Sequence, residues 1–290
     1  MNKRTRISIV TSMFLASSQM LTVAKPPLIP KDVRAFTNTA PTEILGITGT
    51  TYGQGSTIYD VDAMNGNTTN PRTPTYQSSN YKIPFVGFTL VGNSICGLTF
   101  SNLPSYASTL FGIGPNYSFN SLGLRPPTTL NGTEWRCGLE GDIAYDKTSG
   151  KLYATCSNGG WKLVRVDLVS SAVTIPGGNI GSGGYYSALA FNAAGELYAL
   201  DTVSRVLVKL NKNTGGVQGS PIPLSGQLPN TSVNGGMGFN DAGVLYAAFG
   251  GKLMTINVTT GAVSIIGNTA NFSGLIVQGG GLLKIEKKKF

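Results

Sequence analysis

The sequence predicts an all-β fold in which one unit of four short strands is repeated along the chain. Two observations lead to this prediction: the composition, and a period of about 45 residues. Glycine accounts for 39 of the 290 residues, nearly twice its usual share of about 7%. Charged residues make up only 12%, against about 25% in typical domains. This composition, with frequent Ser, Thr and Asn, favours short strands joined by tight turns over helices.

The period is carried by two independent anchors. A Leu-Tyr pair recurs at spacings of 45 and 48 residues, beginning at Leu152, Leu197 and Leu245. An aliphatic residue that opens the following strand recurs at spacings of 44 and 46 residues, at Leu163, Leu207 and Leu253. Four short strands in a unit of this length are typical of a β-propeller blade, so we predict a propeller of four-stranded antiparallel blades.

Each strand of the unit has a recognisable pattern. First strands are small-apolar-small-aromatic runs that end in an Asx-Gly turn, at 141–150, 187–195 and 235–243. Second strands follow at 151–156, 196–200 and 244–249, and third strands at 162–168, 206–215 and 252–261. Fourth strands follow at 172–177, 216–224 and 262–269. The small residues Ala144, Ala190 and Gly238 suit a crowded strand beside the axis, and consecutive apolar positions indicate strands buried on both faces.

Further copies of the repeat match the pattern less closely. Residues 43–49 and 56–68 match second and third strands, and we expect residues 94–101 and 108–114 to form the first and second strands of the next blade. Residues 272–278 resemble a first strand, so strands from both ends of the chain should close the ring. We favour five blades; a terminal hairpin beginning at Leu283 would make a sixth. A tandem pair of β-sandwiches would explain the composition but not the period.

The N-terminus has the order of a secretory signal peptide. A basic start precedes an apolar stretch from Ile7 to Leu21, and small residues at 22–24 offer a cleavage site. We predict a signal peptide over 1–24, a lead-in over 25–42, the propeller over 43–286 and a basic tail over 287–290. The expected location is periplasmic or extracellular, with no integral membrane association after cleavage.

The net charge of +9 lies mostly at the two ends of the chain. Lys and Arg are not clustered with interleaved aromatic residues, so we expect no nucleic-acid partner. The protein is expected to be a monomer. Histidine is absent from all 290 residues, which excludes Ser-His-Asp and Cys-His catalysis and His-ligated metal sites.

The repeated Leu-Tyr-Ala, Leu and Thr-Gly pattern of residues 141–270 resembles exported bacterial propellers with lactonase-like, NHL-like and quinoprotein-like blades. The resemblance implies a blade and no particular reaction. The chain lacks the Gly-His and Trp-Asp signatures of WD repeats, and the paired glycines and Trp of kelch repeats.

Three carboxylates are predicted to approach the central opening. First strands begin, and second strands end, on the same face of a propeller, which places Glu140, Asp142 and Asp201 on one face. Two carboxylates are sufficient for glycoside hydrolysis, and a cluster of them could hold Ca²⁺. They could equally be solvated or cap turns. Asn158 and Trp161 lie near the same rim, where they would suit sugar or peptide contacts.

The three cysteines are assigned by the same reasoning. Cys137 precedes a first strand and Cys156 ends the second strand of the same blade, so these two form the preferred disulfide if one exists. Cys96 is then a buried small hydrophobic residue.

These observations favour an exported, non-catalytic module that binds or scaffolds a protein or glycan. The ligand-binding candidates are Glu140, Asp142, Asn158, Trp161 and Asp201. No residue is assigned as catalytic or as a metal ligand, and no cofactor is expected apart from the calcium alternative. One alternative is a carboxylate-dependent hydrolase acting on a glycan or lactone at the same face. Another is a structural surface protein without a pocket.

Overall fold

The computed structural model of the chain describes residues 42–49, 55–76, 84–92, 94–99, 110–113, 118–121, 129–130, 133–134, 141–157, 160–170, 172–177, 179–181 and 184–279. The chain divides into two compact units, residues 1–31 and 32–290, and every described residue belongs to the second. The predicted signal peptide and basic tail lie outside the described residues. No helix among the residues described is long and apolar enough to cross a membrane.

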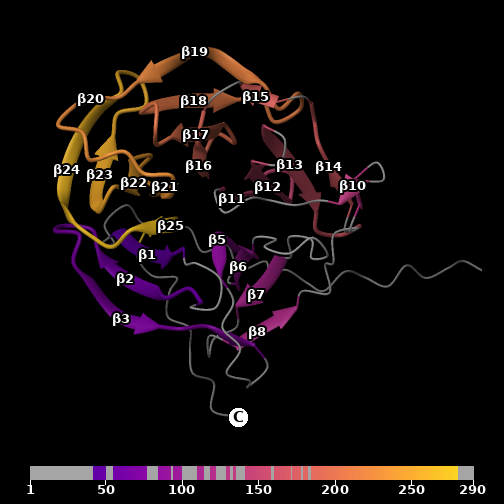
Figure 1. Cartoon of the computed structure of the whole chain (residues 1–290), viewed down its shortest axis with the longest axis horizontal. Helices are drawn as coiled ribbons and strands as arrows, with labels where there is room; N and C mark the ends of the chain where they lie inside the picture. The colour runs from indigo at the N-terminus through magenta and orange to yellow at the C-terminus, as the bar shows by residue number, and fades with distance from the viewer. Residues whose placement is uncertain are drawn as a thin grey trace, which may run out of the picture. The chain divides into compact units, whose positions relative to one another are not determined.

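Five sheets of four or five strands surround one axis in the described part of the chain (Figure 1). Each sheet is a blade whose strands succeed one another outward from the axis. Both chain ends contribute to one blade, which contains β25 (Phe272–Gly279), β1 (Thr42–Thr48), β2 (Ile58–Asp62) and β3 (Thr68–Arg72). The next blade contains β5 (Phe85–Val91), β6 (Ser94–Thr99), β7 (Leu110–Ile113) and β8 (Ser118–Ser121), with β4 (Thr75–Tyr76) added in parallel to β8.

The three blades with the clearest repeat come next in the chain. One contains β11 (Ile143–Asp146), β12 (Lys151–Cys156), β13 (Trp161–Asp167), β14 (Val173–Thr174) and β15 (Asn179–Gly181). Another contains β16 (Tyr186–Phe191), β17 (Leu197–Asp201), β18 (Val206–Leu210) and β19 (Val217–Pro223). The last contains β21 (Gly235–Phe239), β22 (Leu245–Phe249), β23 (Lys252–Ile256) and β24 (Ala262–Asn268), with β20 (Ser225–Gly226) added in parallel to β24. A separate hairpin is formed by β9 (Thr129–Leu130) and β10 (Thr133–Glu134).

The ring is closed by strands from both ends of the chain, as predicted. β25 pairs antiparallel with β1, with Ile44 opposite Val277. The five first strands contact one another in a closed circuit of β25, β5, β11, β16 and β21. This circuit confirms the propeller and gives five blades among the residues described. The tandem sandwich is wrong, because two separate sandwiches have no such circuit.

One blade was assigned incorrectly from the sequence. Residues 94–99 form the second strand β6 and residues 110–113 the third strand β7, whereas the first strand is β5. β5 ends at Val91, and only Gly92 and Asn93 separate it from β6, so its turn reverses the Asx-then-Gly order that marks the other repeats. Without that marker, its apolar run is hard to distinguish from any other buried strand.

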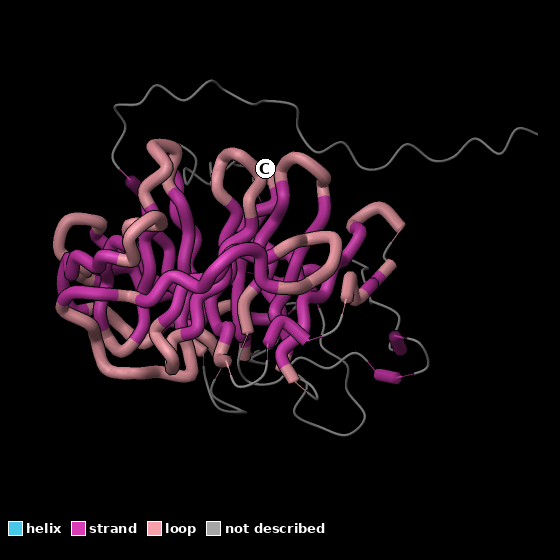
Figure 2. The backbone as a smooth tube through the Cα atoms, turned by 90° about the horizontal axis from the view of Figure 1, so that it is seen from above, coloured by secondary structure: helices cyan, strands magenta, loops and turns pink. Residues whose placement is uncertain are grey.

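The turns between first and second strands follow the predicted chemistry. The side chain of Asp146 accepts a hydrogen bond from Thr148 N at 2.9 Å, and Asn240 accepts one from Val244 N at 2.8 Å. Gly150 and Gly243 adopt φ values of 69° and 79°, which favour glycine. We call the side of the ring that carries turns 147–150, 192–195 and 240–243 the turn face. Figure 2 shows the strands running between two opposite layers of loops.

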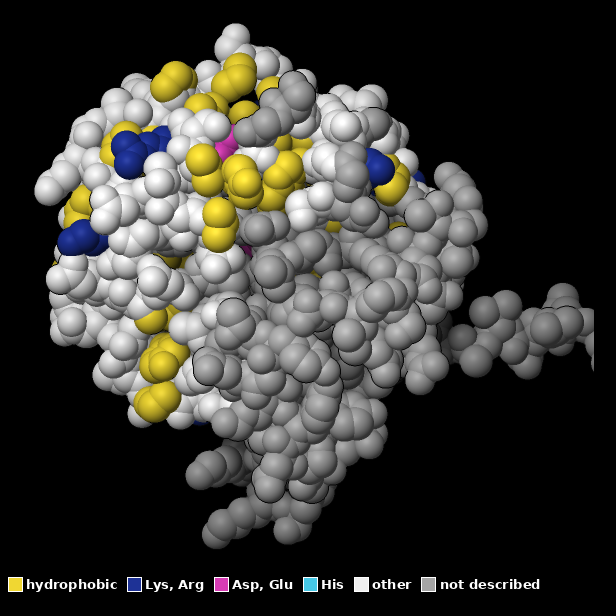
Figure 3. Space-filling model, in the orientation of Figure 1, with side chains coloured by type: hydrophobic (Ala, Val, Ile, Leu, Met, Phe, Trp, Pro, Cys, Tyr) yellow, Lys and Arg dark blue, Asp and Glu magenta, His cyan; other side chains and the backbone are white. Residues whose placement is uncertain are grey.

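The hydrophobic core lies between neighbouring blades. One cluster joins Val86 and Leu98 of the second blade to Ile143, Leu152 and Val166 of the third. Comparable clusters join the other blades. Every residue of β17 is buried, which agrees with its continuous apolar run and its position between two blades. In Figure 3, the Lys and Arg side chains of the described residues form small separate patches on the face in view.

Candidate functional site

The five first strands share one register position beside the axis. At this position each first strand pairs with a Gly or Ala of its second strand. The pairs are Phe88 with Gly97, Ile143 with Ala154, Leu189 with Ala199, Met237 with Ala247 and Leu275 with Gly46. The residues just before these five are therefore equivalent: Gly87, Asp142, Ala188, Gly236 and Gly274. Four are small, and one carries a carboxylate.

The small residues are required because the first strands approach one another closely. A Cβ added to Gly236 would lie 2.4 Å from the backbone carbon of Gly274. A Cβ added to Gly274 would lie 3.0 Å from Phe88 N, and one added to Gly87 would lie 2.7 Å from Asp142 Cα. Contacts this short leave no room for a side chain at these glycines, so neighbouring first strands pack backbone against backbone here; we call this the sealed level.

Asp142 supplies the acceptor that the inner edges of the first strands need. An innermost strand has no neighbour on its axial side, so its N–H groups there must be satisfied otherwise. Asp142 Oδ1 accepts from Ile143 N at 2.8 Å and Oδ2 accepts from Leu189 N at 3.1 Å. The N–H of Phe88 donates a third bond. One carboxylate therefore links three blades.

The environment of Asp142 opposes its ionisation. The residue is 1% exposed, and burial raises the pKa of its carboxyl group well above the usual value, against the effect of the three N–H donors. Its own N–H donates to Thr155 Oγ1 at 3.1 Å. The Asp142 side chain is thus an internal acceptor that connects the first strands around the axis.

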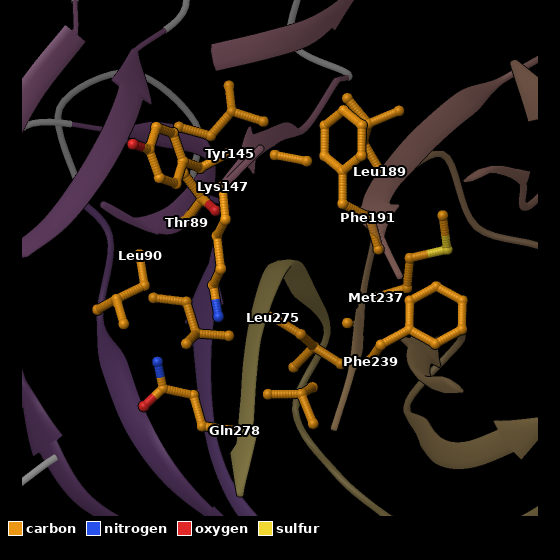
Figure 4. Close-up of a pocket in the computed structure, with 16 residues that line it drawn as sticks. Thr89, Leu90, Tyr145, Lys147, Leu189, Phe191, Met237, Phe239, Leu275 and Gln278 are labelled. Atoms are coloured by element: carbon orange, nitrogen blue, oxygen red, sulfur yellow. The ribbon is translucent and has the colours of Figure 1, made fainter. Parts of the chain in front are cut away.

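A pocket opens at the axis from the turn face. It is lined by the C-terminal halves of all five first strands, has a cavity volume of about 100 Å³ and opens to solvent. Its floor includes Ile143, Leu189, Met237 and Leu275, the residues that follow the sealed level. Figure 4 shows Lys147 extending between the wall of Thr89 and Leu90 and the centre of the pocket, where Leu275 lies. We call this space the axial pocket.

Two aromatic rings in the wall of the axial pocket each pack against a tyrosine ring. Phe191 meets the ring of Tyr153 edge-on, with centroids 5.4 Å apart, and Phe239 packs against Tyr198 at 5.5 Å. The ammonium of Lys212 lies 5.6 Å from the centroid of Phe191. Each ring thus packs against a tyrosine of the preceding blade, on β12 for Phe191 and on β17 for Phe239, so contacts between blades fix the apolar wall.

Two polar groups of the axial pocket have unused hydrogen-bonding capacity. Gln278 is 8% exposed, and its Oε1 atom has no hydrogen-bond donor within the described part of the chain. Lys147 is exposed and makes no ion pair with the residues described. The lining also holds the hydroxyl-bearing Thr89 and Tyr145. Burial and the charge of Asp146 raise the pKa of Tyr145, so its hydroxyl stays protonated.

Asp201 and Trp161 lie elsewhere in the fold. Asp201 pairs with Tyr186, the residue at which β16 begins, and so lies toward the face opposite the turns. Its Oδ1 accepts from Val203 N at 3.0 Å and Ser204 N at 2.8 Å, which caps a turn. Trp161 is buried and meets Tyr186 edge-on at 6.1 Å, so it packs one blade against the next.

The other candidates are not all described. Glu140, Asn158 and Cys137 lie outside the described residues. Both Oδ atoms of Asp142 and the Oδ1 atom of Asp201 accept hydrogen bonds from backbone N–H groups, and neither residue lines the axial pocket. Across the described ranges, no three His, Cys, Asp or Glu side chains gather as metal ligands would. The hydrolase and calcium alternatives therefore receive no carboxylate pair from these two residues.

The sequence did not predict that the residues lining the axial pocket form a site. The aromatic residue that ends each first strand was visible in the repeat, at Tyr145, Phe191 and Phe239. Its recurrence could have predicted an aromatic wall, because equivalent positions of a propeller lie at equal depth around the axis. Lys147 and Gln278 carry no such signal.

The cysteines are in distinct states. Cys156, at the end of β12, is disulfide-bonded. Cys96 is a free, buried thiol, and burial raises its pKa to about 12. The proposed partner of Cys156 is Cys137, outside the described residues, and that pairing stays a prediction.

No family model matches the chain, and no curated protein matches it. Solved structures do resemble it. One is a structural genomics protein of unknown function from Bacteroides thetaiotaomicron VPI-5482, with 14% identity and a TM-score of 0.43, covering 77% of this chain and 58% of that chain. Another is the nidogen/laminin complex, with 13% identity and a TM-score of 0.44, covering 81% and 98%. A third is an auxiliary nutrient binding protein from the same Bacteroides strain, with 11% identity and a TM-score of 0.47, covering 84% and 73%. This chain thus spans little more than half the length of the first protein.

Proposed function

We propose that the protein is an exported, non-catalytic binding module that holds a small ligand, or the end of a glycan chain, in the axial pocket. The observation that carries this proposal is the Oε1 atom of Gln278, which is buried in the pocket wall without a donor. An unsatisfied buried acceptor costs about 1–3 kcal/mol, and native proteins retain few of them. A ligand that donates a hydrogen bond to this oxygen, after the Gln278 amide turns toward it, would recover that free energy.

The construction of the axial pocket supports binding. Its walls come from five blades that pack against one another through the hydrophobic core, so little conformational entropy is lost when a ligand enters. A concave site with apolar walls and a few convergent polar groups is the usual form of a small-molecule site.

The titratable groups favour binding over catalysis. An acid–base catalyst needs a pKa near the working pH, whereas the pKa of Tyr145 is raised above its already high value. Asp142 lies at the sealed level with both carboxylate oxygens engaged by backbone N–H groups. No Asp or Glu is among the described residues that line the pocket.

Export is proposed from the signal-peptide pattern of residues 1–24. Expression of the full chain in a secreting host, followed by N-terminal sequencing, tests it. The expected mature protein begins at Lys25. Recovery of the protein only in the cytoplasm with Met1 retained would contradict this part of the proposal.

The binding proposal is tested with ligand-observed NMR. Saturation transfer is measured from the mature protein to mixtures of monosaccharides, disaccharides, amino acids and short peptides. We expect one class to give signals that Gln278→Met abolishes. The control is Gln218→Met, an exposed position on the edge strand β19, which should keep them. If no compound gives a signal that depends on Gln278, the proposed function is wrong.

A further inference from the structure

We propose that the ligand of the axial pocket is an acidic saccharide. Its carboxylate pairs with Lys147, one of its hydroxyl groups donates to Gln278 Oε1, and its ring lies against Phe191 and Phe239. This inference rests on the proposed function, since it names the chemical class that the same pocket takes.

The charge of the pocket selects for an anion. Lys147 is the one charged residue among the described residues that line it. The residue before it, Asp146, is already engaged: its Oδ2 lies 2.6 Å from Lys212 Nζ and 2.8 Å from Ser149 Oγ. Its Oδ1 accepts from Thr148 N. The charge of Lys212 is therefore compensated, whereas that of Lys147 is available to a ligand.

The same charges exclude ligands that carry an ammonium group. A free amino acid would bring a cation to a lining that offers it no carboxylate among the residues described. The nearest carboxylate below the floor, Asp142, is buried and hydrogen-bonded to three N–H groups. The ligand should therefore be an anion without a positive charge.

A carboxylate fits this site better than a phosphate. Phosphate sites usually combine several backbone N–H groups in addition to positive side chains. At this axis the N–H groups of Phe88, Ile143 and Leu189 already donate hydrogen bonds to the Asp142 side chain, so they are not available to a phosphate. A single lysine then matches the single charge of a carboxylate.

The neutral polar groups require a ligand that also donates hydrogen bonds. Gln278 Oε1 needs a donor, and a carboxylate cannot supply one. Thr89 and Tyr145 add two hydroxyl groups to the lining, more than the single N–H of a C-terminal peptide residue would use. A sugar acid brings several hydroxyl groups and a carboxylate on one ring, and the C–H face of that ring is apolar enough to rest on Phe191 and Phe239.

Pairs of probes that differ only in the carboxylate measure its contribution to binding. The mature protein is titrated with the methyl glycosides of glucuronic, galacturonic, mannuronic and sialic acid, and with the methyl esters of the same four compounds. At least one acid should bind about five- to tenfold more tightly than its ester at low salt. The difference should shrink as ionic strength rises, because Lys147 is exposed and its field is screened.

Two variants assign the effect to the pocket. Lys147→Met should bind an acid and its ester equally, whereas Lys162→Met, on β13 and outside the lining, should keep the preference. Gln278→Met should weaken both acid and ester.

The outcomes separate the two proposals. An acid and its ester that bind equally, both depending on Gln278, would overturn the acidic-sugar inference and leave the binding function standing. Binding of a C-terminal tripeptide that depends on Lys147, with no saccharide bound, would also overturn it. If no probe of any class binds in a manner that depends on Gln278, both proposals are wrong.

Discussion

The carboxylate of Asp142 lies 3.1 Å from the backbone nitrogen of Leu189, which belongs to the first strand of the next blade. The two residues are 47 positions apart in the sequence, about one repeat. Together with the bonds to Ile143 and Phe88, this contact makes one side chain a shared acceptor for three blades. It occupies the position at which the other four first strands have Gly or Ala.

Replacement of Asp142 by Ala should destabilise the ring. Three inner-edge N–H groups would lose their acceptor, and the free energy of unfolding should fall by at least about 3 kcal/mol, since each unsatisfied group costs ~1–3 kcal/mol. Urea unfolding measures the loss. Sodium formate should restore part of it, because a formate ion can occupy the vacated carboxylate position. The control Asp241→Asn, in an exposed turn, should behave as wild type; an unchanged Asp142→Ala midpoint would contradict the assigned role.

Gly87 should not tolerate a methyl group. The added Cβ of Gly87→Ala would lie 2.3 Å from Asp142 Oδ1 and 3.0 Å from Ile143 N, so backbone must move, at a cost of about 3 kcal/mol. Gly216→Ala is the matched control, because the added Cβ would lie 3.8 Å from its nearest neighbour, Thr214 Oγ1. Thermal denaturation should show a large drop for the first variant and almost none for the second. Equal melting temperatures would argue against this close packing at the sealed level.

The ion pair between Asp146 and Lys212 should couple neighbouring blades. A double-mutant cycle with Asp146→Asn and Lys212→Met should give a coupling energy of about 1–3 kcal/mol at pH 7. The partly exposed pair of Lys151 and Asp167, 3.7 Å apart within one blade, should give about 0–1 kcal/mol. Equal coupling in the two pairs would contradict the importance of burial, since Asp146 has a side chain only 1% exposed.

The pH dependence of that coupling has a definite sign. Burial acts to raise the pKa of Asp146, but the bonds from Lys212, Ser149 and Thr148 outweigh it and lower the pKa. The unfolded state therefore binds more protons near pH 4, and the stabilisation is present above the unfolded pKa of about 3.9. It should be lost as the pH falls through the lowered folded pKa. A coupling energy that grows with acidification would contradict this assignment.

Gln278→Met should raise the stability of the free protein. The substitution keeps the side-chain length and removes the buried acceptor without a donor, so the free energy of unfolding should increase by about 1 kcal/mol. Gln218→Met should change it by less than about 0.5 kcal/mol. Chemical denaturation of the ligand-free protein measures both. A loss of stability in Gln278→Met would indicate that the Gln278 amide is satisfied within the protein.

The proposed disulfide between Cys137 and Cys156 predicts a simple thiol count. The native protein should show no reactive thiol, because Cys96 is 1% exposed and burial raises its pKa to about 12. In denaturant without reductant, one thiol should react. Peptide mapping under non-reducing conditions should recover a linked pair containing Cys137 and Cys156. Two or more reactive thiols in denaturant would exclude the pairing.

The sequence alone determined the blade and the closure of the ring. The spacing of Leu152, Leu197 and Leu245 records a repeated hairpin, and side-chain alternation and Asx-Gly turns are local properties that a repeat displays directly. The first-strand pattern at 272–278 was enough to predict pairing with the N-terminal strands, because one blade lacked its inner strand. β5 was not recognised as a first strand because its turn reads Gly92-Asn93, the reverse of the Asx-then-Gly order in the other repeats.

The site depended on tertiary structure. Asp142 appears in the sequence as a residue at the start of a strand, where a carboxylate is usually solvated. Only the closed circuit of five first strands shows that it is buried against the N–H groups of three of them. Likewise, Lys147 and Gln278 are about 130 residues apart and share a pocket only because the ring brings their strands to one axis. The sequence pattern reports which residues each strand buries, whereas the partners across the axis depend on how the blades close.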